Sequence, residues 1–387
     1  MFKIKLFNQI DEVGLARLPE NFEIVETDDY DGIILRSFKM DDSQVIPSLA
    51  AVARAGAGVN NIPIIDYAEK GIVVFNTPGA NANAVKELVI LGALLACRQV
   101  AAGIQWLNSV DPSAVEVDKL VEEQKAQFVG PEILGKKVGV IGLGAIGVLA
   151  ANAFADLGAD VYGFDPFISI EHAWGLKSDI HRANSMESIF TSCDFVTLHI
   201  PFTDTTKEII NADLLSQAKQ GIKILNFARA ELVDDAALLE AIESGKVAVY
   251  VTDFPNNNVA GKPGVIAIPH LGASTPEAET NCAIMAADQI AEYLDSGNII
   301  NSVNYPDCTL GALTGKARLG LNHKNMPNMI GQITAVLAVG NLNIANMINK
   351  SKGEFAYTLI DIDEEFGDDI IDALEKIDGV LKVRKLG

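Results

Sequence analysis

The stretch "VGVIGLGAIGVLAANAFADLGADVYGFDP" (residues 138–166) decides the fold of this chain. A short apolar run leads into the glycine turn GLGAIG, a helix of small residues follows, and a second apolar run ends at an aspartate. Glycines at this spacing let the backbone approach a pyrophosphate, which then lies at the positive N-terminus of the helix. The stretch therefore predicts a βαβ unit that binds a dinucleotide.

Asp165 ends the second strand of this unit and suggests which dinucleotide is bound. A carboxylate at this position accepts hydrogen bonds from the hydroxyls of the adenine ribose and repels a 2′-phosphate. We therefore expect NAD rather than NADP. A tight turn without a ligand would explain the glycines alone, but not their place between a strand and a helix.

The alternation of strands and helices continues in both directions, which predicts an α/β fold with two doubly wound Rossmann-like parallel sheets. Long apolar helices are expected over residues 83–107 and 276–297, with a polar, acidic connection at 111–125. The strands are expected at 32–38, 71–77, 195–201, 221–228, 248–254 and 264–270.

Residues 316–387 follow a glycine-bearing linker (311–316) and repeat a smaller pattern of strand, helix, hairpin, helix and strand. This βαββαβ order is that of a ferredoxin-like module. The segment carries nine basic and ten acidic residues, so it is close to neutral, whereas the whole chain has a net charge of −21. The asymmetry favours a separate C-terminal module.

The strong negative charge argues against nucleic acid and against an anionic membrane as partners, because both need a basic surface. The four cysteines are far apart in the sequence, which indicates buried reduced thiols, and we expect no metal site. The N-terminal segment has no signal-peptide pattern. A cytoplasmic enzyme or regulator is the expectation.

Polar residues follow several strands of the second sheet, at the edge where ligands bind in such folds. Arg229 and His270 have the chemistry for hydride transfer to or from a 2-hydroxy acid. The arginine can pair with the carboxylate and the carbonyl oxygen, while the histidine exchanges the hydroxyl proton. Either residue alone would be ambiguous, but together they favour this function. The residues at these strand ends are Ile200, Pro201, Ala228, Arg229, Asp253 and His270.

The motifs "VGVIGLGAIG", "LHIP", "NFARAELVDDAALLEAIESGKV" and "PHLGAST" resemble the D-2-hydroxyacid dehydrogenase family. "ARAGAGVNNI" (53–62) and "NTPGANANAVKE" (76–87) are similar to its phosphoglycerate dehydrogenase branch. The resemblance implies a cofactor domain inserted into a substrate domain. It places the substrate domain at 1–95 and 285–310, the NAD domain at 96–284 and a regulatory domain at 316–387.

The resemblance also implies roles for individual residues. Arg229 would bind and polarise the substrate, His270 would be the acid/base, and Asp253 would contact the nicotinamide amide. Around the cofactor we expect Gly142, Gly144, Ala145, Ile146, Gly147, Asp165, Ile200, Pro201, Phe227, Ala228, Arg229, Asp253, His270 and Gly272.

The chain departs from the family at two places. Ala230 replaces the usual glycine after the catalytic arginine. The glutamate that pairs with the histidine would fall at Asn258, in "DFPNNN" (253–258). An amide can orient the imidazole but supplies no negative charge, so we expect Asn258 to leave His270 with a lower pKa than a glutamate would. Alternatively, the fold brings in another carboxylate.

The phosphate of a phosphorylated 2-hydroxy acid needs a local cation. Arg54, in "ARAGAG", is the first candidate, next to Gly56, and Arg36 and Lys39 are the second. A solvated surface role is the alternative for Lys39.

The segment 321–347 resembles the ACT regulatory domain of serine-inhibited relatives. His323, Asn325 and Asn343 fall on its effector positions, which implies an L-serine site; the alternative is that the module only mediates assembly into a homo-oligomer. Two other functions stay open. One is a glyoxylate, hydroxypyruvate or 2-oxoglutarate reductase, and the other is a dinucleotide-sensing corepressor.

Overall fold

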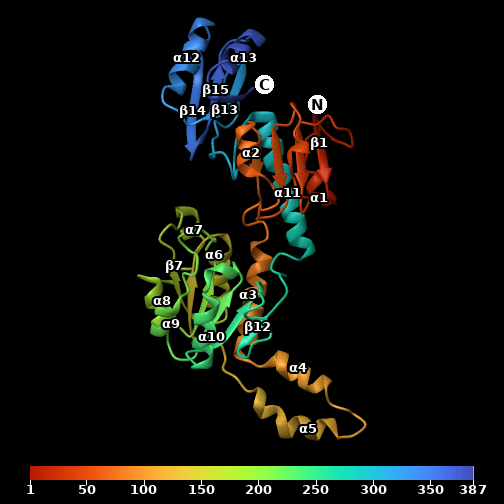
Figure 1. The fold of residues 1–387 in the computed structure, drawn as a ribbon, viewed down its shortest axis with the longest axis vertical. Coiled ribbons are helices and arrows are strands. Elements are labelled where there is room, and N and C mark those ends of the chain that lie inside the picture. Colours follow the sequence, from red (N-terminus) through yellow and green to blue (C-terminus); the bar gives the residue numbers. More distant parts are fainter. Residues whose placement is uncertain (387) are drawn as a thin grey trace. The chain divides into compact units, whose positions relative to one another are not determined.

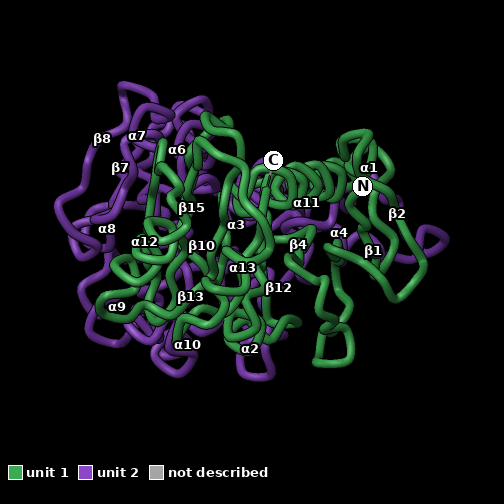
Figure 2. Tube along the Cα trace, turned by 90° about the horizontal axis from the view of Figure 1, so that it is seen from above, with its two compact units in different colours: residues 1–81, 276–387 green, residues 82–275 purple. Residues whose placement is uncertain are grey.

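The computed structural model describes residues 1–386, and the chain divides into two compact units (Figure 2). Unit 1 comprises Met1–Asn81 and Pro276–Gly387, and unit 2 comprises Ala82–Thr275, so the second unit interrupts the sequence of the first. The chain thus crosses between units at 81/82 and 275/276, whereas the sequence suggested boundaries near 95 and 285. Each unit is described by itself.

The N-terminal part of unit 1 is a five-stranded sheet with the order β2-β1-β3-β4-β5, and all of its paired strands are parallel. The long helix α11 (Pro276–Ser296) packs against β3, β4 and β5. Its buried face is rich in alanine, which lets the helix lie close to the sheet. The other elements are β1 (Phe2–Phe7), α1 (Glu12–Leu15), β2 (Phe22–Val25), β3 (Gly32–Leu35), η1 (Asp42–Gln44), β4 (Ala51–Arg54), α2 (Ile64–Glu69) and β5 (Val73–Phe75).

Unit 2 contains a seven-stranded parallel sheet with the order β12-β11-β10-β9-β6-β7-β8 (Figure 1). One core packs α3 and α6 against this sheet, and a second core packs α8, α9 and α10 against it. The expected doubly wound fold is therefore present. Its elements are β6 (Lys137–Ile141), α6 (Ala145–Asp156), β7 (Asp160–Phe164), α7 (Ile170–Trp174), β8 (His181–Arg182), α8 (Met186–Ser192), β9 (Phe195–Leu198), α9 (Ala212–Gln217), β10 (Ile222–Asn226), η3 (Ala230–Leu232), α10 (Asp235–Glu243), β11 (Val247–Thr252) and β12 (Val265–Ala267).

The single helix expected over 83–107 is wrong, because the chain bends by 71° between α3 (Ala82–Cys97) and α4 (Val100–Asn108). The returning chain lies against the end of α3: a Cβ on Gly130 would be 1.8 Å from the carbonyl oxygen of Cys97. The connection after α4 is also more ordered than expected, since it contains α5 (Val117–Gln124) and η2 (Lys125–Phe128). Within residues 1–386, no single helix is long and apolar enough to cross a bilayer; only α3 and α4 taken together across their bend meet that test.

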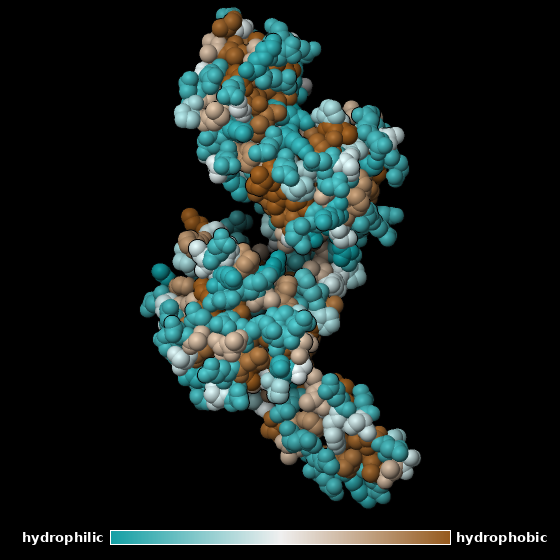
Figure 3. All heavy atoms as spheres, in the orientation of Figure 1, coloured by the Kyte–Doolittle hydropathy of each residue, from teal (hydrophilic) through white to brown (hydrophobic). Residues whose placement is uncertain are grey.

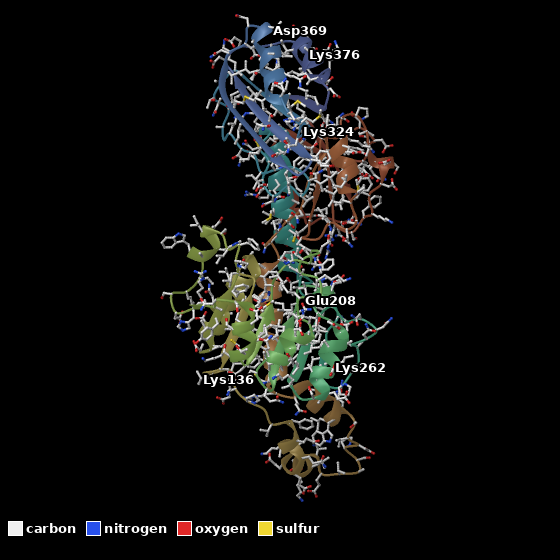
Figure 4. The ribbon with its side chains drawn as sticks, turned by 60° about the vertical axis from the view of Figure 1, so that its left-hand side comes forward. Lys136, Glu208, Lys262, Lys324, Asp369 and Lys376 are labelled. Atoms are coloured by element: carbon white, nitrogen blue, oxygen red, sulfur yellow. The ribbon has the colours of Figure 1, made fainter. Side chains whose placement is uncertain are left out.

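The C-terminal part of unit 1 has the predicted βαββαβ order, with an antiparallel sheet ordered β14-β15-β13-β16. We call it the C-terminal module. Asp369 lies in the first turn of α13, and Lys376 is the C-cap residue that follows this helix (Figure 4). Along β15, Tyr357 and Leu359 belong to the core around α11, whereas Ile360 and Ile362 pack with α12 and α13. The elements are β13 (Ala317–Lys324), α12 (Met329–Val339), β14 (Ile344–Lys352), β15 (Phe355–Ile362), α13 (Asp368–Glu375) and β16 (Val380–Leu386).

Side chains of the C-terminal module cap the carbonyl groups at the end of α11. The Arg384 guanidinium donates to the carbonyl oxygens of Tyr293 and Leu294 at 3.1 and 2.6 Å. The Tyr357 hydroxyl donates to the carbonyl of Gly297 at 2.9 Å, and Arg318 Nη1 donates to that of Ser296 at 3.0 Å. The last carbonyls of a helix have no partner within the helix, so these bonds join the C-terminal module to the end of α11.

Candidate active site

The dinucleotide turn of unit 2 runs from the end of β6 into α6, and two of its glycines cannot be replaced. Gly142 has φ of 87°, and a Cβ on it would be 2.6 Å from the carbonyl oxygen of His199. A Cβ on Gly147 would be 1.9 Å from the carbonyl oxygen of Gly142. The turn is therefore as tight as the sequence motif requires.

The N-terminus of α6 is open to a ligand. Gly144 is the N-cap, and within the described residues no side chain caps the helix. A Cβ on Gly144 would have no described atom within 4 Å, so the first backbone N–H groups face open space. This arrangement fits the pyrophosphate of NAD, which an uncapped N-terminus binds. Ala145 and Ile146 form the first positions of the helix, as expected.

The Asp165 carboxylate lies beside this turn, because its Oδ2 accepts from the backbone N–H of Leu143 at 2.8 Å. Its Oδ1 accepts from the N–H of Phe167, also at 2.8 Å. These bonds fix the orientation of the carboxylate, and each oxygen keeps a lone pair for a ribose hydroxyl. The position agrees with the predicted role in NAD binding.

Other residues expected near the cofactor follow β9 and β10. Ile200 lies against the turn, since a Cβ on Gly142 would be 2.9 Å from its Cγ2, and Pro201 is the next residue, beyond the end of β9 at Leu198. Phe227 differs, because its ring is buried in the core close to Gly92 of α3, so only its backbone can face a ligand. The half-buried His199 beside the turn is held neutral, since desolvation of its ring lowers its pKa to about 4.

The two candidate catalytic side chains meet at one aromatic ring. The centroids of the Phe254 and His270 rings are 4.3 Å apart, and the Arg229 Cζ lies 5.3 Å from the centroid of the Phe254 ring. Arg229 is exposed and donates to the carbonyl oxygen of Ala228 at 2.6 Å, leaving further N–H groups for a substrate. Unit 2 therefore brings Arg229 and His270 together, as predicted, through a phenylalanine that the sequence analysis did not single out.

Asp253 is the buried carboxylate of this cluster, with 1% of its surface exposed. Its Oδ2 accepts from the N–H of Gly272 at 3.2 Å, while its Oδ1 has no hydrogen-bond partner among residues 1–386. Burial raises the pKa of Asp253, opposed by the charges of His270 and Arg229. An unpaired buried acceptor is costly, so this oxygen suits the amide N–H that the family resemblance assigns to it.

The expected role of Asn258 is not supported by its position. The side-chain amides of Asn256 and Asn258 both donate to Oδ2 of Asp235, at 2.9 and 2.8 Å. Asp235 is the first residue of α10, so these hydrogen bonds hold the loop against that helix. These two amides therefore anchor a loop, and they do not contact the His270 ring. The contact with Asp235 is long-range, and the sequence carries no signal for it.

Unit 1 holds the predicted phosphate-binding candidates. Arg54 is half-buried at the end of β4, its Nε donates to the carbonyl oxygen of Arg36 at 2.9 Å, and its Nη1 donates to that of Gly58. A side chain at Gly58 would strike this guanidinium. Arg36 itself pairs with Glu279, Nη2 to Oε1 at 2.6 Å. Lys39 is exposed, and Gly56 follows Arg54 in the same turn.

Of the three expected effector residues, Asn343 lies at a different end of the C-terminal module from His323 and Asn325. His323 is buried, with Nδ1 and Nε2 near the Lys324 carbonyl and the Thr358 hydroxyl, at 2.9 and 2.8 Å. Asn325 donates to the carbonyl of Gly353, and Asn343 donates to the Asp363 carboxylate. Because 353 and 363 flank opposite ends of β15, one copy of the module does not gather these residues.

Residues 93–272 match the NAD-binding domain of the D-isomer-specific 2-hydroxyacid dehydrogenases. The chain is 32% identical to the D-3-phosphoglycerate dehydrogenase of Haemophilus influenzae over 89% of its own length and 82% of that protein. It is 31% identical to the one from Methanocaldococcus jannaschii over 93% of its length, which spans 67% of that relative.

Among solved structures, the NAD-bound 3-phosphoglycerate dehydrogenase of Entamoeba histolytica matches 78% of this chain and 98% of its own, with 26% identity and a TM-score of 0.59. A D-mandelate dehydrogenase of Rhodotorula graminis, at 20% identity and a TM-score of 0.65 over 78% of this chain and 97% of its own, shares the fold. The matched range 93–272 contains the glycine turn and the second parallel sheet. The chain therefore belongs to the D-isomer-specific 2-hydroxyacid dehydrogenase family of NAD-dependent oxidoreductases.

Proposed function

We propose that this chain oxidises D-3-phosphoglycerate to 3-phosphohydroxypyruvate with NAD, the first step of serine biosynthesis. The names of its relatives support the substrate. The observation that carries the chemistry is the meeting of Arg229 and His270 at the Phe254 ring, at the same edge of the sheet as the dinucleotide turn.

NAD supplies the acceptor for the hydride that leaves the 2-carbon. The Arg229 guanidinium is suited to bind the substrate carboxylate and the oxygen on that carbon, because only one of its N–H donors has a described partner. His270, exposed at the same edge, takes the proton of the hydroxyl. Arg229 thus orients the substrate, and His270 transfers the proton.

Arg54 is the cation that we assign to the substrate phosphate. Its two bonds to carbonyl oxygens hold the guanidinium at the end of β4, in a chain that is otherwise strongly acidic. A fixed planar guanidinium suits a phosphate better than a mobile lysine does, so Lys39 is the weaker candidate.

NADH formation across matched acids tests this function. The expected result is turnover of D-3-phosphoglycerate with a kcat/KM at least about a hundredfold above that of D-glycerate, reflecting about 2.7 kcal/mol of phosphate binding. Arg54→Ala should remove most of this preference while leaving D-glycerate almost unchanged. A wild type that prefers an unphosphorylated acid would overturn the substrate assignment and favour a reductase of this family.

We also propose that the chain forms a homo-oligomer and that the C-terminal module is an ACT-type domain that binds L-serine. Val100, Ile104 and Leu107 leave one apolar face of α4 exposed (Figure 3), as a second copy would require. The edge strand β14 offers another contact: an antiparallel second copy would bring the Asn343 end of one module toward the Asn325 end of the other. A serine site assembled in this way needs both copies.

Calorimetry with L-serine, combined with sedimentation, tests the effector. Serine should bind the wild type and not Asn343→Ala, and binding should weaken when dilution dissociates the oligomer. If serine gives no heat at any protein concentration, the module serves assembly alone.

A further inference from the structure

His270 lacks the partner that the family resemblance would give it. In the described part of the chain its ring has no hydrogen bond and no ion pair, since the amides of Asn256 and Asn258 are bound to Asp235. An acid/base residue must nevertheless be held in one orientation, because a displacement of about 1 Å can cost about a hundredfold in rate. Another group must therefore supply the orientation.

Phe254 is the side chain that contacts this imidazole. The two ring centroids are 4.3 Å apart with an interplanar angle of 46°, which is within the range of favourable aromatic pairs. The same ring lies 5.3 Å from the Arg229 Cζ, a cation–π distance. One side chain therefore touches both the proton-transfer group and the substrate-binding group.

The position of the Phe254 ring is itself fixed by its surroundings, so the ring can orient the two side chains that contact it. Its backbone N–H donates to the Thr252 hydroxyl at 3.0 Å, and Thr252 is fully buried at the end of β11. The phenylalanine is half-buried and has only two side-chain torsions, so little freedom is left to it. A ring at the end of a core strand can therefore support its neighbours, whereas the amides of the following loop are bound to Asp235.

We propose that Phe254 is a positioning residue for catalysis, whose ring orients His270 and Arg229 together and takes over the orienting part of the role that a glutamate has in relatives. This proposal rests on the proposed function of those two residues.

Substitution of the ring tests the proposal. Phe254→Leu keeps an apolar side chain of similar bulk but has no aromatic face, and Phe254→Tyr keeps the face. We expect Phe254→Leu to lower kcat by about thirtyfold with less than a twofold change in KM for NAD, and Phe254→Tyr to stay within about threefold of wild type.

The pH profile separates positioning from a merely structural role. An aromatic face stabilises a protonated imidazole by a cation–π interaction, so its loss should let His270 release its proton at lower pH. Oxidation needs the neutral imidazole, so the acid limb of the kcat/KM profile should move to lower pH by about 0.5 unit in Phe254→Leu and not in Phe254→Tyr.

Phe128→Leu is the matched control, because Phe128 contacts Trp106 in the same unit and not the catalytic side chains. It should change neither kcat nor the acid limb. If Phe254→Leu behaves like this control while His270→Gln is inactive, the positioning role is wrong and the proposed function stands. If His270→Gln keeps wild-type turnover, the proposed function itself fails.

Discussion

Two buried aspartates, Asp361 and Asp253, differ in how many hydrogen bonds their carboxylates accept. Asp361, at 0% exposure in the C-terminal module, receives Arg318 Nε at 2.6 Å and Nη2 at 3.0 Å, and also the Thr314 hydroxyl at 2.8 Å. Asp253, at 1% exposure in unit 2, has a backbone N–H on one oxygen and no described partner on the other. Only the first carboxylate is saturated with partners.

Their acidities follow from the number of partners. Burial alone would raise the pKa of Asp361, but the hydrogen bonds from Arg318 and Thr314 outweigh it and lower the pKa. At Asp253 burial dominates and the pKa is raised. A carboxylate with every oxygen paired stabilises a fold, whereas a buried oxygen left open is a cost that a ligand can relieve.

The arginines repeat this contrast. Arg318 is 1% exposed and its remaining nitrogen donates to the carbonyls of Ser296 and Gly311, so it has no capacity for a ligand. Arg229 is exposed and has one carbonyl partner. In a chain of net charge −21, an arginine whose N–H donors are mostly unused indicates a ligand-binding role. An arginine whose donors are all bound within the protein indicates a role in stability.

Among the variants compared here, removal of the Arg229 side chain should have the largest effect on activity. Arg229→Ala is expected to lower kcat/KM at least about a thousandfold, about 4 kcal/mol of transition-state binding, because the substrate loses its bidentate donor. The affinity for NADH, followed by fluorescence, and the melting temperature should hardly change. A variant with near-wild-type kcat/KM would show that Arg229 is a surface residue after all.

Removal of the charge of Asp361 should mainly reduce stability. Asp361→Asn leaves Arg318 buried without a counter-charge, and we expect the free energy of unfolding of unit 1 to fall by about 3 kcal/mol. Denaturant titration measures this loss, and Asp253→Asn, which breaks no ion pair, is the control with a smaller expected loss. Equal losses of unfolding free energy in the two variants would show that Asp361, with all its partners, is no more important for stability than Asp253.

Lys382 extends the comparison to the junction between the C-terminal module and the N-terminal part of unit 1. Its ammonium donates to the carbonyls of Pro47 and Leu49, at 3.1 and 2.6 Å, and burial, followed by the charge of Arg384, lowers its pKa to about 8, while Asp31 and Glu375 oppose the shift. The unfolded chain holds this proton up to about pH 10.5. Between pH 8 and 10.5 it therefore binds more protons than the folded chain does, and stability gains from rising pH.

Relative to Lys382→Met, the wild type should thus gain stability as the pH rises through this window, by about 2 kcal/mol. Paired denaturant titrations at pH 7.5 and 10.5 measure the difference. If the two proteins keep a constant difference in unfolding free energy, the ammonium is hydrated in solution and the junction is looser than the contacts indicate.

The sequence by itself determined the parts of this protein that depend on local pattern. The glycine turn, Asp165 at the end of the next strand, and the βαββαβ order of the module could all be predicted, because strand and helix periods and left-handed turns are properties of neighbouring residues. Arg229 and His270 could be chosen since parallel strands end at one edge.

Only the tertiary structure decided the features that depend on distant residues. Three sets of contacts join segments that are far apart in the chain. Gly130 packs against the end of α3, the side chains of Asn256 and Asn258 bind Asp235, and Arg384 caps α11. The meeting of Phe254 with His270 likewise depends on the packing of two strand ends. Such contacts are selected by the balance of burial, charge and hydrogen bonding in the folded chain, which no local pattern encodes.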